Sequence, residues 1–142
     1  MLILSKQRVY RLEKPLKCLT KKHIDYLVQE CRLNSWPYAR ICLHESESSL
    51  LMSMVLVMVD RFVYPPHRHP WKTESYVVLR GVADLELYDL ETKQLDVSLT
   101  MRTGDSFHND YFGYHTFTPK TDVFVFLEST HGPLCDQEIE FL

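Results

Sequence analysis

Short segments of alternating apolar and polar residues, each closed by a turn signal, fill the chain from Tyr38 onward and constrain its fold most. In the clearest of them, residues 82–88, Val, Asp, Glu and Tyr alternate with Ala and Leu. Successive side chains of a strand point to opposite faces of a sheet, so this pattern predicts a strand with one wet face. Turn signals at 80–81, 89–93 and 103–105 separate it from its neighbours. Many short strands at such intervals predict an all-β sandwich or barrel.

One further segment fits the interior of such a fold, and another lies outside it. The nearly continuous apolar run from Leu50 to Val59 is typical of a strand buried on both faces. Four apolar residues fall at helical spacing: Ile24, Leu27, Val28 and Cys31. With Thr20 as its N-cap, this stripe predicts one amphipathic helix over about Lys21 to Leu33.

No segment is long enough to act as a linker between domains. We therefore expect a single domain over 1–142, with a helical segment at about 20–34 and a barrel at about 38–130. Residues 1–19 are polar and predict irregular structure, and the acidic tail after His131 predicts a mobile end.

Composition excludes several classes of partner. The net charge of -3 comes from interspersed acids and bases, and no basic stripe indicates nucleic-acid binding. The longest apolar run is about half of the ~20 residues that span a bilayer, and the N-terminal segment is too polar for a signal peptide. We expect a cytoplasmic protein without membrane contact. Its cysteines, at 18, 31, 42 and 135, are then reduced thiols.

A cluster of metal-ligand residue types follows the break at Pro65-Pro66. His67 and His69 are two residues apart, so on a strand they point to the same side. A bend at Pro70-Trp71 would bring the Glu74 carboxylate back to the same point, and His115 would arrive from another strand. Three imidazoles and one carboxylate suit a borderline divalent metal. Fe²⁺, Mn²⁺, Ni²⁺, Co²⁺ and Zn²⁺ all fit this set.

The spacing of these residues resembles two motifs of the cupin superfamily. Residues 67–81, H-x-H-x4-E-x6-G, are similar to the first motif, and Gly104 to His115 has the spacing of the second. The resemblance implies a double-stranded β-helix, or jelly-roll, barrel with a short N-terminal helix. It also implies that a metal is held in the barrel mouth by His67, His69, Glu74 and His115.

A closer resemblance, to the WbuC-type cupin metalloproteins, covers most of the chain. It rests on the segments 38–44, 66–69, 74–81 and 113–116 and on the late Glu128 and Gly132-Pro133. The WbuC-type proteins are encoded among genes for bacterial surface polysaccharide such as O-antigen. The resemblance implies a sugar or nucleotide sugar as the small-molecule ligand, but it does not supply a reaction.

Three functions remain open from the sequence. Four protein ligands on an octahedral ion leave two positions for water or substrate, which is typical of a catalytic or ligand-binding metal. The first function is a metal-dependent sugar isomerase or epimerase, the second an iron-dependent oxygenase, and the third a non-enzymatic binding module. The isomerase needs an acid/base group near the metal, for which His44 and Tyr76 are the candidates.

Six further residues are candidates for contact with the ligand. Arg40 and His44 would share one strand face and suit an anionic or hydroxylated ligand, although a surface ion pair explains them equally well. Aromatic residues that would stack on a sugar or base are Tyr76, Tyr88, Tyr114 and Trp71. Packing in the barrel accounts for such aromatics more often. The Arg68 side chain is predicted to point away from the metal. We also expect a homodimer, because strands in the first half carry no edge-blocking residues.

Overall fold

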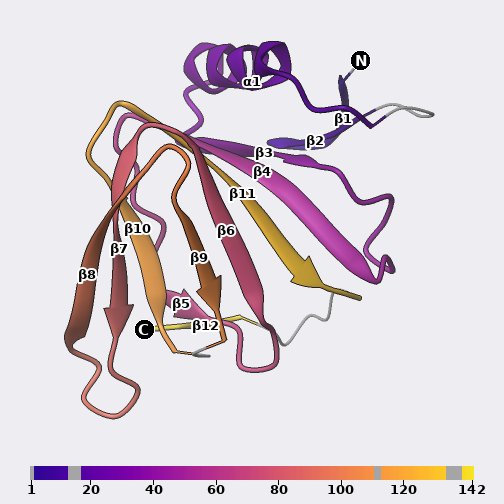
Figure 1. The fold of residues 1–142 in the computed structure, drawn as a ribbon. Helices are drawn as coiled ribbons and strands as arrows, with labels where there is room; N and C mark the ends of the chain where they lie inside the picture. The colour runs from indigo at the N-terminus through magenta and orange to yellow at the C-terminus, as the bar shows by residue number, and fades with distance from the viewer. Residues whose placement is uncertain (1, 13–16, 111–112, 134–138) are drawn as a thin grey trace.

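Two β-sheets and one helix make up the protein in a computed structural model (Figure 1). The structure describes residues 2–12, 17–110, 113–133 and 139–142. Within these ranges one sheet has seven strands and the other has five. The two sheets face one another, and the helix lies against the outside of the larger sheet (Figure 1). The all-β fold with a helix near its N-terminus is confirmed.

The larger sheet has the order β1-β2-β3-β4-β11-β6-β9. Its strands, in this order, are Leu2–Lys6, Val9–Leu12, Tyr38–Cys42, Leu51–Val59, Val123–His131, Glu74–Arg80 and Ser106–Asn109. Only β2 and β3 pair in parallel, and all other neighbours are antiparallel. Residues near the end of the chain are thereby paired on both sides with central segments, because β11 lies between β4 and β6.

The smaller sheet has the order β12-β5-β10-β7-β8, all antiparallel. Its strands, in this order, are Glu140–Phe141, His67–Arg68, His115–Pro119, Val82–Tyr88 and Leu95–Arg102. The chain passes from β6 in the larger sheet to β7 in the smaller one through a turn at Gly81, whose φ is +82°. A turn with positive φ favours glycine, which explains the signal seen in the sequence.

Strand β4 divides the interior into two apolar clusters. Val55, Val57 and Val59 are at most 1% exposed and pack against the helix side. The intervening Leu56 and Met58 pack between the two sheets. The predicted burial of this run on both faces is therefore confirmed, and the alternation of its faces assigns one side to the helix and the other to the inner space.

The helix α1, Lys21–Leu33, has the predicted bounds. Thr20 is its N-cap, and the Thr20 backbone N–H donates to Nδ1 of His23 at 3.0 Å. The buried residues are those of the predicted stripe: Ile24, Leu27, Val28 and Cys31. Local capping and one apolar face thus account for the element without reference to the sheets.

Both ends of the chain differ from the prediction. Residues 1–19 are not irregular throughout, because β1 and β2 form a hairpin that extends the larger sheet; residues 1 and 13–16 lie outside the described ranges. Tyr10 and Leu12 of β2 are buried beneath the helix, which stabilises the added strands. The tail is not free at its end either. Strand β12 pairs with β5, and Arg68 Nε lies 2.6 Å from an oxygen of Glu140.

Candidate functional site

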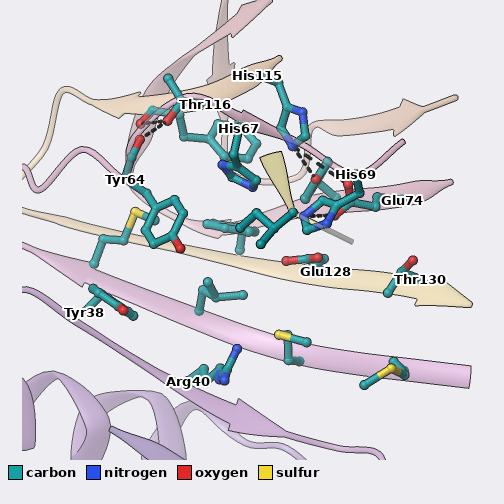
Figure 2. Close-up of a pocket in the computed structure, with 18 of the residues that line it drawn as sticks. Tyr38, Arg40, Tyr64, His67, His69, Glu74, His115, Thr116, Glu128 and Thr130 are labelled. Atoms are coloured by element: carbon teal, nitrogen blue, oxygen red, sulfur yellow. Dashed lines mark hydrogen bonds and ion pairs between the residues drawn. The ribbon is translucent and has the colours of Figure 1, made fainter. Parts of the chain in front are cut away.

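A cavity of about 430 Å³ lies between the two sheets and holds the candidate residues (Figure 2). Strands β3, β4, β6 and β11 of the larger sheet form one side, and β5 and β10 of the smaller sheet form the other. All four predicted metal ligands line this space. The two sheets therefore bring together residues that are up to 48 positions apart, from His67 to His115.

Strand pairing and a turn position the four side chains. His67 and His115 are register partners on β5 and β10, with ring centroids 4.8 Å apart. A turn in which the Lys72 N–H donates to the His69 carbonyl leads the chain into β6, which begins with Glu74. The two Glu74 oxygens lie 3.9 Å from Nε2 of His69 and 3.9 Å from Nε2 of His115. The bend predicted at Pro70-Trp71 is present.

Backbone carbonyls orient two of the imidazoles. Nδ1 of His67 lies 3.0 Å from the Pro65 oxygen, and Nδ1 of His115 lies 3.1 Å from the Gly113 oxygen. A carbonyl only accepts hydrogen bonds, so each Nδ1 carries the proton and each Nε2 keeps its lone pair. The Tyr76 hydroxyl donates to Nε2 of His115 at 3.0 Å. The contacts at Nδ1 are of the kind that typically orients histidine ligands of metals.

Burial keeps these imidazoles neutral. The pKa of His115 is lowered to about 3, chiefly by burial and in addition by the neighbouring His67. Burial also lowers the pKa of His67, against the opposing contact with the Pro65 carbonyl. A neutral imidazole is the form that binds metals.

Glu74 is the most constrained residue of the site. Its side chain is 2% exposed, and Oε1 has no hydrogen-bond partner among the residues that the structure describes. A buried carboxylate oxygen without a partner is costly, because it has lost its water and gained nothing in return. The oxygen faces the imidazole nitrogens, so a cation bound between them would compensate this cost.

A second carboxyl group, on Glu128, lies beside Glu74. Burial raises the pKa of Glu128 to about 8, and repulsion by the Glu74 carboxylate and a hydrogen bond with it add to the shift. At neutral pH Glu128 therefore holds a proton. The sequence analysis did not identify Glu128 as a pocket residue. The available signal was its place on the inward face of β11, where it follows Phe124 and Phe126 in alternation.

The donor set fits a divalent transition metal in its chemistry: three imidazoles, two of them with Nδ1 on a backbone carbonyl, and one unpartnered carboxylate oxygen. The side chains are close without yet surrounding one point. Within the described ranges, no three His, Cys, Asp or Glu side chains are arranged so that they would hold an ion as they stand.

A family model matches residues 19–99, more than half of the chain, and its description is "Domain of unknown function (DUF6016)". The chain belongs to this family. No curated protein gives a significant match.

Solved structures similar to this DUF6016 protein share its fold. KdgF from Halomonas sp. is 17% identical, with a TM-score of 0.57 over 70% of this chain and 82% of that one. The DMSP lyase DddQ from Ruegeria pomeroyi DSS-3 is 22% identical, with a TM-score of 0.60 over 75% and 52%. CapF, solved with the inhibitor 3-isopropenyl-tropolone, is 11% identical, with a TM-score of 0.64 over 75% and 32%.

The chain thus spans about half of DddQ and a third of CapF. At these identities the likeness establishes the fold, a cupin jelly roll, and confirms the predicted architecture.

Two residues predicted to contact a ligand lie away from the cavity of the DUF6016 protein. His44 follows the end of β3 at Cys42, so the alternation that would have placed it beside Arg40 does not continue. Its ring Nδ1 instead donates to the Ser53 carbonyl at 3.0 Å. Tyr88 ends β7, and its hydroxyl donates to the Glu86 carboxylate at 3.1 Å. The predicted pocket positions of His44 and Tyr88 are wrong.

Of the remaining aromatic and basic candidates, two line the cavity and the others do not. Arg40 and Tyr76 line the cavity, as predicted. Trp71 is 78% exposed, whereas Tyr114 is buried beneath the Arg68 guanidinium, 5.6 Å from its ring centre. Arg68 therefore points away from the cavity, as predicted. Cys31 is a buried, free thiol, Cys42 is buried, and Cys135 lies outside the described residues. No described helix is long and apolar enough to cross a membrane.

Proposed function

We propose that this protein is a metal-binding cupin in which His67, His69, Glu74 and His115 hold one divalent transition metal. The observation that carries the proposal is the unpartnered, buried Oε1 of Glu74 facing Nε2 of His115. The cost of burying such an oxygen is large, and Oε1 has no hydrogen-bond partner among the described residues. A cation resolves the conflict.

We further propose that the protein acts on a small molecule in this cavity. A bound divalent ion would supply Lewis-acid polarisation of a carbonyl or hydroxyl group. Of the two predicted acid/base candidates, Tyr76 lines the cavity and His44 does not. Glu128 joins Tyr76, because it is the register partner of Tyr76 on the neighbouring strand β11 and lines the same cavity (Figure 2). Isomerisation or epimerisation requires a group of this kind to exchange a proton with the substrate.

The substrate class is proposed from the resemblance to the WbuC-type cupins: a sugar or nucleotide sugar of bacterial surface-polysaccharide biosynthesis. The free thiols Cys18 and Cys31 support the proposal of a cytoplasmic location, where thiols persist. We also propose a homodimer.

Metal content of purified variants tests the proposal. We expect the wild-type protein to bind about one equivalent of metal, and His69→Ala and His115→Ala to retain a small fraction of it, since each removes one of four ligands. His108→Ala is the matched control, because His108 is exposed on β9 and lies outside the cavity. Full metal occupancy in both ligand variants would refute the assignment. Oxygen consumption by the iron form without turnover of any nucleotide sugar would favour an oxygenase instead.

A further inference from the structure

Two arginines lie in the same cavity at a distance from the histidines. Arg40 comes from β3, and Arg8 lies in the turn between β1 and β2, with a φ of +62°. The Arg40 backbone N–H donates to the Arg8 carbonyl at 2.9 Å, so the two residues are neighbours across adjacent strands. Figure 2 shows Arg40 on the opposite side of the cavity from His67 and His115.

The two guanidinium groups have no carboxylate partner among the described residues. Within residues 2–12, 17–110, 113–133 and 139–142, neither guanidinium takes part in an ion pair, and the Arg8 guanidinium lies over the Tyr38 ring at 4.5 Å. Both carboxyl groups that line the cavity, on Glu74 and Glu128, belong to its histidine side, and so does Lys72, in the turn before Glu74. The two arginines therefore stand apart from the acidic groups of the cavity.

An aromatic wall joins the two ends. The Tyr38 and Tyr64 rings meet edge to face with centroids 5.9 Å apart, and Tyr64 meets His67 in the same way at 5.0 Å. The facing side chains of β4 are apolar: Met54, Leu56 and Met58. A neutral sugar finds few hydrogen-bond partners along this stretch, whereas a ring or hydrocarbon body finds complementary surface.

We propose that the ligand of this cavity is an organic anion whose carboxylate or phosphate group binds between Arg8 and Arg40. Its apolar or ring-shaped body lies along the wall of Tyr38 and Tyr64, and its other end reaches the histidines. Arginine recognises carboxylate and phosphate through a planar fork of donors, and one anion relieves the repulsion between the two cations. The inference deepens the proposed function, because it narrows the substrate class to acidic molecules, a phosphorylated sugar included.

Calorimetry with three probes of one length tests this: hexanoate, hexyl phosphate and the neutral hexanamide. We expect one or both anions to bind the metal-stripped wild-type protein at least tenfold more tightly than hexanamide. Whether hexanoate or hexyl phosphate binds better identifies the anion. Arg40→Gln should weaken the favoured anion at least tenfold and Arg8→Gln severalfold, while the affinity for hexanamide stays the same. Arg32→Gln is the matched control, because Arg32 pairs with Asp122 on the surface.

The choice of metal-stripped protein separates the two proposals. Anion binding that appears only after metal is added, and that is unaffected by Arg40→Gln, would overturn the inference and leave metal binding intact. Arginine-dependent anion binding in a protein that takes up no metal would support the anion site and refute the metal site. If none of the three probes binds the wild-type protein at millimolar concentration, the inference of an anion site is also overturned. Arg40→Lys, which keeps the charge, should recover part of the affinity if Arg40→Gln is poorly folded.

Discussion

At the scale of single residues, a buried tyrosine links stability to pH. Tyr10 is 3% exposed, and its hydroxyl donates to the Glu30 carboxylate at 2.9 Å. Burial raises the pKa of Tyr10 above its ordinary value of 10.0, and the hydrogen bond with Glu30 raises it further. Above pH 10 the unfolded chain loses this proton while the folded protein keeps it. The stabilisation is therefore complete below pH 10 and is lost as the pH rises.

Tyr10→Phe is the variant that tests this. At pH 7 we expect it to be less stable than wild type by about 1.5 kcal/mol, the usual contribution of a hydrogen bond to a charged group. By pH 11 the wild-type protein should have lost about 1.4 kcal/mol more than the variant, because the phenylalanine does not titrate. Urea unfolding of both proteins across this pH range measures the difference. A gap that stays constant to pH 11 would contradict the proposed linkage.

At the scale of elements, the turn that connects β6 in one sheet to β7 in the other depends on its glycine. Gly81 has positive φ, and a Cβ there would collide with the Val123 carbonyl of β11. Gly104, with a φ of +94°, is a matched control, because a Cβ there would meet no atom within 4 Å.

In both alanine variants the positive φ costs about 1–2 kcal/mol of backbone strain. Only Gly81→Ala adds a collision with another part of the chain. We expect Gly81→Ala to be less stable than Gly104→Ala by about 2 kcal/mol, the typical effect of overpacking. Thermal unfolding of the two variants compares them directly. Equal melting temperatures would show that the turn at Gly81 can move away from β11.

At the scale of the whole molecule, the predicted homodimer has one strong candidate surface. Strand β8 ends the smaller sheet, and within the described residues it pairs only with β7. Its apolar face is open, with Leu95 52%, Val97 36% and Leu99 53% exposed. If two copies pair antiparallel about Leu99, Asp96 of each lies opposite Arg102 of the other. In this register the apolar residues of the two copies lie together and the opposite charges of Asp96 and Arg102 face each other.

Charge reversal tests the register. We expect Leu99→Lys to give a monomer, because two lysines would meet at the two-fold axis. Asp96→Arg should weaken association severalfold, and the double variant Asp96→Arg/Arg102→Asp should restore it, since the opposite charges exchange places. Light scattering gives the mass of each protein. A monomer mass for the wild-type protein at micromolar concentration would refute the dimer.

The sequence by itself determined whatever depends on short-range patterns. The helix has its predicted bounds because one apolar stripe and a capping threonine lie within its own residues. The alternating strands and glycine turns gave the all-β class, and the H-x-H spacing identified the side chains that meet in the cavity. That these four bind a metal, and that residues 1–142 form one domain, stay predictions.

Only the tertiary structure decided which distant segments meet. It placed Glu128 beside Glu74, because β11 lies between β4 and β6, and it placed Arg8 beside Arg40 by pairing an N-terminal hairpin with β3. It removed His44 from the cavity, because β3 ends at Cys42. Periodicity reports the faces of a single strand, whereas the order of strands in a sheet depends on the burial of all of them at once. For that reason no local pattern contained the carboxyl pair or the arginine pair.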